Sequence, residues 1–132
     1  MVGGNAQFTD RTAAAATDAT SQKISSPDFS TLHLTSARKL AWSEFGSADG
    51  LPVVFFHSSG SSRLEAKLFH EHAQRAGIRL ISVDRPGIGR SDFSFSSTPE
   101  PFARDLLELL DHLRLEKVSI LTLGHGVVYA LA

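Results

Sequence analysis

Three short apolar runs, separated by helical patterns, constrain the fold of this chain more than any other feature of its sequence. The runs are VVFFH at 53–57, IRLISVD at 78–84 and KVSILTL at 117–123. Continuous apolar runs of this length are typical of strands buried on both faces, as in a parallel sheet. The alternation of strands and helices therefore predicts an α/β fold with right-handed crossovers.

An antiparallel pair of strands is expected before these runs. Residues 31–46 show alternating patches on either side of a Ser-Ala-Arg break and end at Gly46. Residues 1–30 are rich in Ala, Ser, Thr and Gly, with only two Phe. Such a segment cannot bury enough apolar surface to offset its ordering entropy. We therefore expect a disordered tail at 1–30 and a partial α/β domain at 31–132.

Two helices are expected between the parallel strands, and a third opens at Gly126. The first begins with Ser62 and Glu65 in capping-box spacing and ends at Gly77. The second starts with Ser97 or Thr98 as its cap and Pro99 in the first turn. Their predicted apolar sides are Leu64, Leu68 and Phe69 in the first helix, and Phe102, Leu106, Leu109, Leu110 and Leu113 in the second.

The composition excludes several classes of function. The 13 basic and 14 acidic residues are spread through the chain and give a net charge of −1, so no field favours nucleic acid or an anionic membrane. There is no cysteine, which excludes disulfides and thiolate metal sites. The apolar runs are far shorter than the roughly 18 residues of a membrane span. We expect a soluble chain, with a cytoplasmic location favoured.

Ligands of parallel sheets bind beyond the carboxyl ends of the strands, where three loops are expected here. The first, at 57–62, places His57, Ser58 and further hydroxyl residues before a helix. This arrangement suits an oxyanion or a phosphate, or alternatively serves only to form turns and cap the helix.

The second loop, at 85–97, follows Asp84, and we expect a structural role for it. Asp84 and Arg85 can pair with each other or bond backbone groups, which would hold the loop in shape. The residues assigned to this structural loop are Asp84, Arg85, Gly87, Gly89 and Ser91.

Together these blocks carry a family resemblance. HSSGSSR at 57–63, DRPGIGRSD at 84–92 and the closing YALA at 129–132 resemble the N-terminal half of the α/β-hydrolase fold family, over about residues 33–132. The resemblance implies an antiparallel hairpin followed by β-α-β-α-β-α in a mostly parallel sheet with helices on both faces, incomplete at its C-terminal side. It also implies hydrolysis of esters or related bonds, with a small-molecule substrate in the full-length relatives.

The third loop departs from the family at its catalytic turn. The family's nucleophile elbow is Gly-x-Ser-x-Gly. Aligned without gaps from YALA, the corresponding residues here are Thr122, Leu123, Gly124, His125 and Gly126. Glycine therefore stands at the nucleophile position, while a gapped alignment deletes the Ser outright. In the oxyanion loop, the strand-ending His57 is followed by Ser58, where the family usually has Gly.

We expect the chain to be hydrolytically silent, with no catalytic residue assigned and with Thr122 and His125 as weak substitutes for the missing nucleophile. The family's acid and His belong to a later part of the fold. The alternatives are a truncated product, a pseudo-enzyme that binds a small molecule or a protein, and a degenerate dinucleotide module read from GHGVVY at 124–129.

No cofactor is expected. No metal site is expected either, because His70 and His72 have the wrong spacing for one helix face. Partners are open, with self-association through an exposed sheet edge as one candidate.

Overall fold

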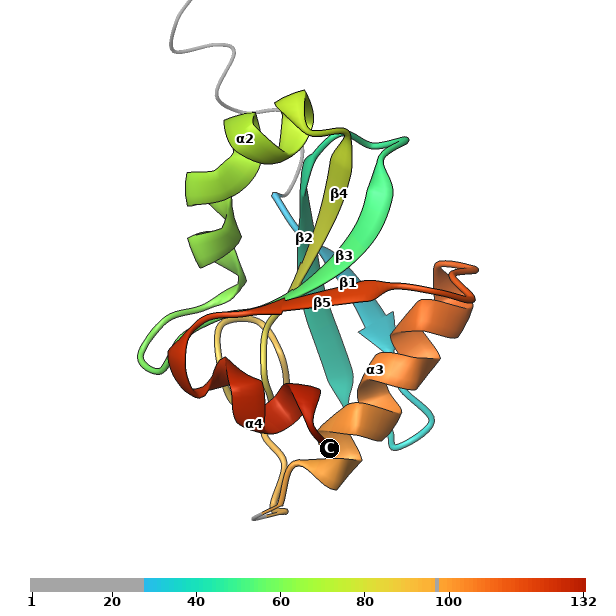
Figure 1. Cartoon of the computed structure of the whole chain (residues 1–132). Helices are drawn as coiled ribbons and strands as arrows, with labels where there is room; N and C mark the ends of the chain where they lie inside the picture. The colour runs from blue at the N-terminus through green and yellow to red at the C-terminus, as the bar shows by residue number, and fades with distance from the viewer. Residues whose placement is uncertain (1–27, 97) are drawn as a thin grey trace, which may run out of the picture.

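A mixed sheet of five strands forms the centre of the fold (Figure 1), in a computed structural model that describes residues 28–96 and 98–132. The strands are β1 (Ser30–His33), β2 (Lys39–Gly46), β3 (Leu51–Phe56), β4 (Ile78–Val83) and β5 (Ser119–Thr122). Their spatial order is β1-β2-β4-β3-β5. β2 pairs antiparallel with β1 and β4, whereas β3 pairs parallel with β4 and β5. The predicted antiparallel hairpin and parallel sheet are confirmed.

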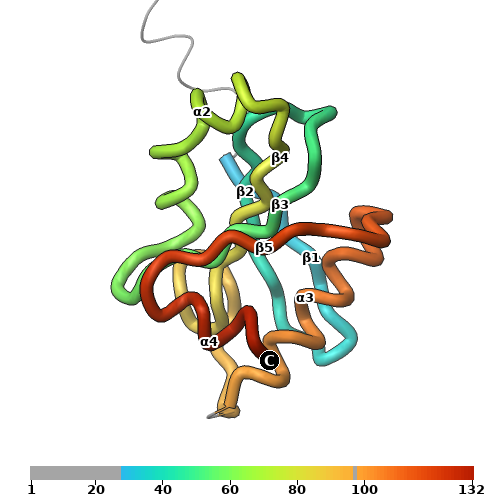
Figure 2. The backbone as a smooth tube through the Cα atoms, in the orientation of Figure 1, coloured from blue at the N-terminus to red at the C-terminus, as the bar shows by residue number. Residues whose placement is uncertain are grey.

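Helices cover both faces of this sheet, as expected. They are η1 (Arg63–Phe69, a 3₁₀ helix), α2 (His70–Arg75), α3 (Glu100–His112), η2 (Gly124–Gly126, also 3₁₀) and α4 (Val127–Ala130). Figure 1 shows α2 and α3 on opposite sides of the sheet. In Figure 2 the C-terminal segment runs back from β5 to lie beside the beginning of α3, where Tyr129 packs edge-on against Phe102 at 5.5 Å between ring centroids.

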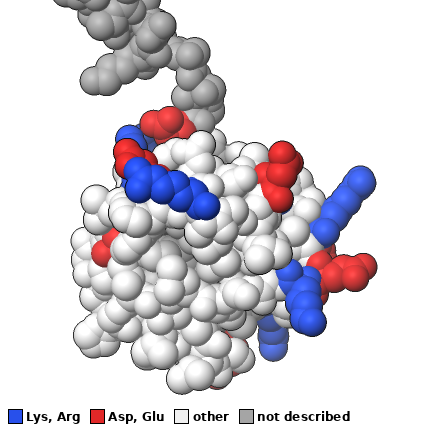
Figure 3. All heavy atoms as spheres, turned by 45° about the horizontal axis from the view of Figure 1, so that its top comes forward, with Lys and Arg blue, Asp and Glu red and all other residues white. Residues whose placement is uncertain are grey.

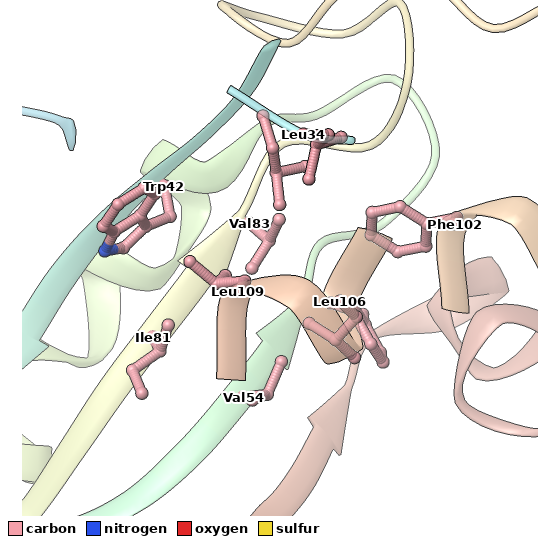
Figure 4. Close-up of a cluster of buried hydrophobic side chains, with 10 residues drawn as sticks. Leu34, Trp42, Val54, Ile81, Val83, Phe102, Leu106 and Leu109 are labelled. Atoms are coloured by element: carbon pink, nitrogen blue, oxygen red, sulfur yellow. The ribbon is translucent and has the colours of Figure 1, made fainter. Parts of the chain in front are cut away.

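The main core lies between the sheet and α3. Alternate residues of β3 and β4 point to the same face, and there Val54, Ile81 and Val83 meet Leu109 of α3 (Figure 4). The predicted apolar side of this helix is confirmed, since Phe102, Leu106 and Leu109 are buried and Leu110 and Leu113 pack against the cluster.

The first crossover helix differs from its prediction. Its first part is a 3₁₀ helix, in which residues three apart share a face. Arg63 and Ala66 are therefore buried, together with Ala73 in α2. The predicted side is wrong for two of its three residues, because Leu64 is 47% and Leu68 78% exposed.

The predicted capping box is also only half correct. The Ser62 hydroxyl does cap η1 by accepting a bond from the Leu64 N–H at 3.3 Å. The Glu65 carboxylate does not reach back to Ser62, because it accepts both polar hydrogens of Ser58. The tertiary contact therefore replaces the local one.

The start of α3, at Glu100, lies one or two residues later than predicted. Pro99 is the N-cap residue, not a first-turn residue, and no side chain caps the helix. Pro99 and Pro101 both lack an N–H, so fewer donors at this end need a partner. Ser97, one of the two predicted caps, lies outside the described residues, as do residues 1–27 of the expected tail.

Charged side chains are mixed on the surface. On the face drawn in Figure 3, basic and acidic groups lie interspersed around a broad area free of charge. Exposed or half-exposed ion pairs such as Arg79 with Glu44 and Arg75 with Glu71 contribute to this mixing. Within the described residues, no helix is both long enough and apolar enough to cross a bilayer.

The two faces of α3 provide a matched test of this packing. Replacing Leu109, which is fully buried, with Ala should lower the free energy of unfolding by about 2–5 kcal/mol because it leaves a cavity against β3 and β4. The same change at Leu107, which is 61% exposed on the same helix, should cost less than about 0.5 kcal/mol. Urea unfolding measures both values, and equal losses would contradict the orientation of α3.

Candidate functional site

The ends of three neighbouring strands bring the expected loops together. Thr122, the last residue of β5, is aligned with Phe56, the last residue of β3. The Leu123 N–H then donates to the Phe56 carbonyl at 3.1 Å. His57 follows β3 and Asp84 follows β4, so both lie at the same edge of the sheet as the turn after β5.

A sharp turn at Gly124 connects β5 to the helices that follow. Leu123 is extended, with φ −116° and ψ 133°, whereas Gly124 has φ +51°, in the left-handed region that favours glycine. A β-carbon built on Gly124 would contact only the Ser58 Cβ, at 3.7 Å. The apex of the turn is therefore exposed, open, and next to the loop after β3.

Gly126 makes the same turn possible by close packing. Its backbone φ of −56° is ordinary, but a β-carbon there would lie 2.8 Å from the Phe56 carbonyl oxygen and 3.2 Å from that of His57. Only a glycine lets the start of the helix approach β3 this closely. The two glycines thus serve different needs, a positive φ at 124 and a missing side chain at 126.

Ser58, on the expected oxyanion loop, is held by Glu65. The carboxylate accepts the Ser58 N–H at 2.7 Å and the Ser58 hydroxyl at 2.6 Å. Both donors of Ser58 therefore point to a carboxylate of this chain. An oxyanion hole requires free donors aimed at the developing negative charge, and here an acidic group already occupies this pair.

His57 is fully buried behind that loop, and burial lowers its pKa below the ordinary histidine value. The nearby Arg85 charge also lowers the pKa, whereas the bond to the Ser58 carbonyl opposes the shift. The bonding pattern suits a neutral ring with its proton on Nδ1. That nitrogen donates to the Ser58 carbonyl at 3.0 Å, and Nε2 accepts weakly from the Arg85 N–H at 3.5 Å.

Arg85 connects the loop after β4 to the other two loops. Its Nη2 donates to the Ser58 carbonyl at 3.1 Å and lies 3.2 Å from the His57 ring. Its guanidinium also rests on the Tyr129 ring, 5.0 Å from the centroid. Arg85, Tyr129 and His125 line a hollow of about 350 Å³ beside the turn.

Asp84 anchors its loop through a buried carboxylate. Its oxygens accept the Arg63 N–H at 2.8 Å, the Arg63 guanidinium at 2.7 Å and the Arg90 N–H at 2.9 Å. Its basic partner is therefore Arg63 and not the neighbouring Arg85. Gly89, with φ +57°, lies so close that a β-carbon would overlap this carboxylate.

Ser91 attaches the loop after β4 to β2, and Gly87 closes the loop on itself. The Ser91 hydroxyl donates to the Asp84 carbonyl at 2.8 Å and accepts the Ala41 N–H at 2.9 Å. Gly87 has φ +78°, and its N–H donates to the Asp92 carbonyl at 3.0 Å within the loop. Five residues singled out in the sequence thus lie in one bonded loop.

Three residues that matter here were missed in the sequence: Arg63, Glu65 as the partner of Ser58, and Tyr129 beneath Arg85. Arg63 and Glu65 look like ordinary charged positions of a solvent-exposed helix. Nothing local in the sequence marks them, since each bond joins segments that only the sheet brings together. Across residues 28–96 and 98–132, no cluster of three or more His, Asp or Glu is placed to hold a metal ion.

Comparisons with known proteins agree with this geometry. No protein-family profile matches the chain. A curated relative, an uncharacterized hydrolase of Bacillus subtilis named YcgS, is 27% identical over 77 residues, which is 58% of this chain and 27% of that protein. The chain therefore spans about a quarter of that relative's length.

Solved structures match a larger part of the chain. An esterase from Exiguobacterium antarcticum superposes with a TM-score of 0.67 and 26% identity, covering 77% of this chain and 38% of that one. A hydrolase from Pseudomonas aeruginosa gives 0.68 and 24%, covering 75% and 37%. An epoxide hydrolase from Vigna radiata gives 0.67 and 20%, covering 77% and 33%. Each of these neighbours is more than twice the length of the matched part.

The two glycines of the turn provide a matched pair of variants. Gly126→Ala should lower the free energy of unfolding by about 2 kcal/mol or more, because the new methyl group overlaps the Phe56 carbonyl. Gly124→Ala should cost only about 1 kcal/mol, the strain of a left-handed residue in open space. Urea unfolding compares them, and a larger loss at 124 would show that the turn is built differently.

The buried His57 predicts a pH dependence of stability. Because its pKa is lowered in the folded protein, stability is full above the unfolded pKa of about 6.5 and falls with decreasing pH as the unfolded chain takes up the proton first. Between about pH 7.5 and about pH 5.5, His57→Asn should therefore lose less unfolding free energy than the unchanged protein. The exposed His33→Asn is the matched control, and an unchanged pH response in His57→Asn would refute the assignment.

Proposed function

We propose that this chain, which shares its fold with α/β-hydrolases, belongs to that family and keeps at residues 122–126 the shape of a nucleophile elbow without the hydrolytic chemistry. On this proposal the chain as given does not hydrolyse esters. It acts instead by binding a small molecule in the hollow beside the turn.

One observation carries the proposal: the apex of the turn is a glycine with positive φ, and among the described residues outside the turn a β-carbon there would meet only Ser58. Nucleophile elbows hold a serine in a strained turn so that its hydroxyl projects over the sheet. Here Gly124 adopts the positive φ without strain, and the apex carries a hydrogen atom. Acyl transfer at this point has no attacking oxygen.

The environment of Ser58 supports the same proposal. A tetrahedral intermediate needs positive potential where its oxygen becomes charged. At the expected oxyanion loop, the Glu65 carboxylate accepts both donors of Ser58, which places negative charge beside the turn. The Ser58 hydroxyl donates to the same carboxylate, so it is not free to donate to an oxyanion.

Thr122 and His125, the two weak substitutes for the nucleophile, also lack the surroundings that a nucleophile needs. Thr122 is half-buried at the end of β5, in register with Phe56, and lies before the apex. His125 is exposed after the apex and lines the hollow. Among the described residues, neither side chain forms a hydrogen bond to an activating partner, so neither resembles a nucleophile activated by a positioned base.

An aryl ester assay tests whether the chain lacks hydrolytic activity. With p-nitrophenyl acetate, the purified chain should give no saturable turnover, only a rate that rises linearly with ester concentration, as exposed imidazoles produce. Thr122→Val and His125→Gln are the matched variants, since each removes one substitute group while keeping its size. Saturable turnover that either variant abolishes would overturn the proposal.

A further inference from the structure

The hollow beside the turn has one arginine and a mixture of polar and apolar side chains in its wall. Its lining residues are Ser59, Gly60, Arg85, Pro86, Ile88, His125, Val128 and Tyr129, and its volume is about 350 Å³. It lies where the loops after β3, β4 and β5 meet. A space of this size accepts a small organic molecule.

Arg85 is the unusual group in this hollow, because it is a nearly buried cation without an anion. Its exposed fraction is 7%, and its guanidinium contacts the Ser58 carbonyl, the His57 ring and the face of Tyr129. Within residues 28–96 and 98–132, the ion pairs are formed by Arg38, Arg63, Arg75 and Arg79, and Arg85 takes part in none of them.

Two acidic groups of the site, Asp84 and Glu65, are already engaged. The Asp84 carboxylate pairs with Arg63, and the Glu65 carboxylate is bound to Ser58. A buried charge is costly unless it is paired and fully hydrogen-bonded. Among the described residues, the Arg85 guanidinium forms its hydrogen bonds through Nη2. Arg85 thus retains N–H donors for an anion entering the hollow.

We propose that this hollow binds a small monocarboxylate with an apolar body, through an ion pair between the carboxylate and the Arg85 guanidinium. The planar fork of a guanidinium matches a carboxylate in size and geometry. The apolar part of the ligand lies against Pro86, Ile88 and Val128.

The lining also sets the class of anion. Arg85 is the only Lys or Arg in the wall of the hollow, so one negative charge is matched and a phosphate dianion is not. Pro86, Ile88 and Val128 offer apolar contact to an aryl or alkyl body, whereas citrate brings further carboxylates that no second Lys or Arg of the wall matches. Such acids are the products of ester hydrolysis, and a site without a nucleophile binds them without further reaction.

Isothermal titration with phenylacetate and its neutral analogue phenylacetamide tests the proposal on the unchanged protein. The acid should bind at least about tenfold more tightly than the amide, the scale of one charge-assisted hydrogen bond. Equal affinities, or no binding of phenylacetate up to about 10 mM, would overturn it. This comparison uses the unchanged protein, so its result does not depend on whether a variant folds.

Variants then assign the effect to Arg85. Arg85→Gln should remove the preference for the acid, whereas Arg90→Gln, on the same loop but outside the hollow, should keep it. A preserved preference in folded Arg85→Gln would refute the role of Arg85. The inference rests on the proposed function, but different results contradict the two. Saturable ester turnover would contradict the proposed lack of hydrolysis, whereas equal binding of acid and amide would contradict only the carboxylate site.

Discussion

The buried carboxylate of Asp84 is the interaction on which the arrangement of the site depends. It stands at the end of β4 and accepts bonds from Arg63, at the start of η1, and from the backbone of Arg90 in the following loop. A buried charge with this many donors resists displacement, because removing one partner leaves the other uncompensated. The loops after β3 and β4 therefore have fixed positions, and the turn after β5 packs onto them through Gly126 and Phe56.

The chemistry of the site follows from where charge lies on that frame. Glu65 places a carboxylate on the loop that faces the turn, and Arg85 places a guanidinium on the other side of the same loop. His57 is buried between them, where burial lowers its pKa, and it bonds to the Ser58 carbonyl. On our proposal, the negative side disfavours a developing oxyanion, and the positive side leaves a guanidinium facing the hollow. The proposed site then combines the turn of a nucleophile elbow with electrostatics suited to binding.

The sequence predicted some elements well and others poorly, for separable reasons. The parallel strands, the hairpin and the apolar side of α3 follow from periodicity, because each pattern extends over enough residues to be unambiguous. The first crossover helix failed because a 3₁₀ segment changes the period from 3.6 to 3, which exposes Leu64 and Leu68 and buries Arg63. The capping box failed because Glu65 had a stronger tertiary partner in Ser58. A local sequence pattern does not show that a residue outside the helix competes for the same side chain.

By itself, the sequence determined that the strands alternate with helices, that their loops meet at one sheet edge, and that the residue at the expected nucleophile position is glycine. These features are written in residue type and spacing, so no coordinates are needed to recognise them. Only the tertiary structure decided that Gly124 adopts a positive φ opposite Ser58, that Asp84 pairs with Arg63, and that Arg85 is buried without an acidic partner. The physical reason is that burial and pairing are properties of segments far apart in the chain, which meet only when the sheet forms.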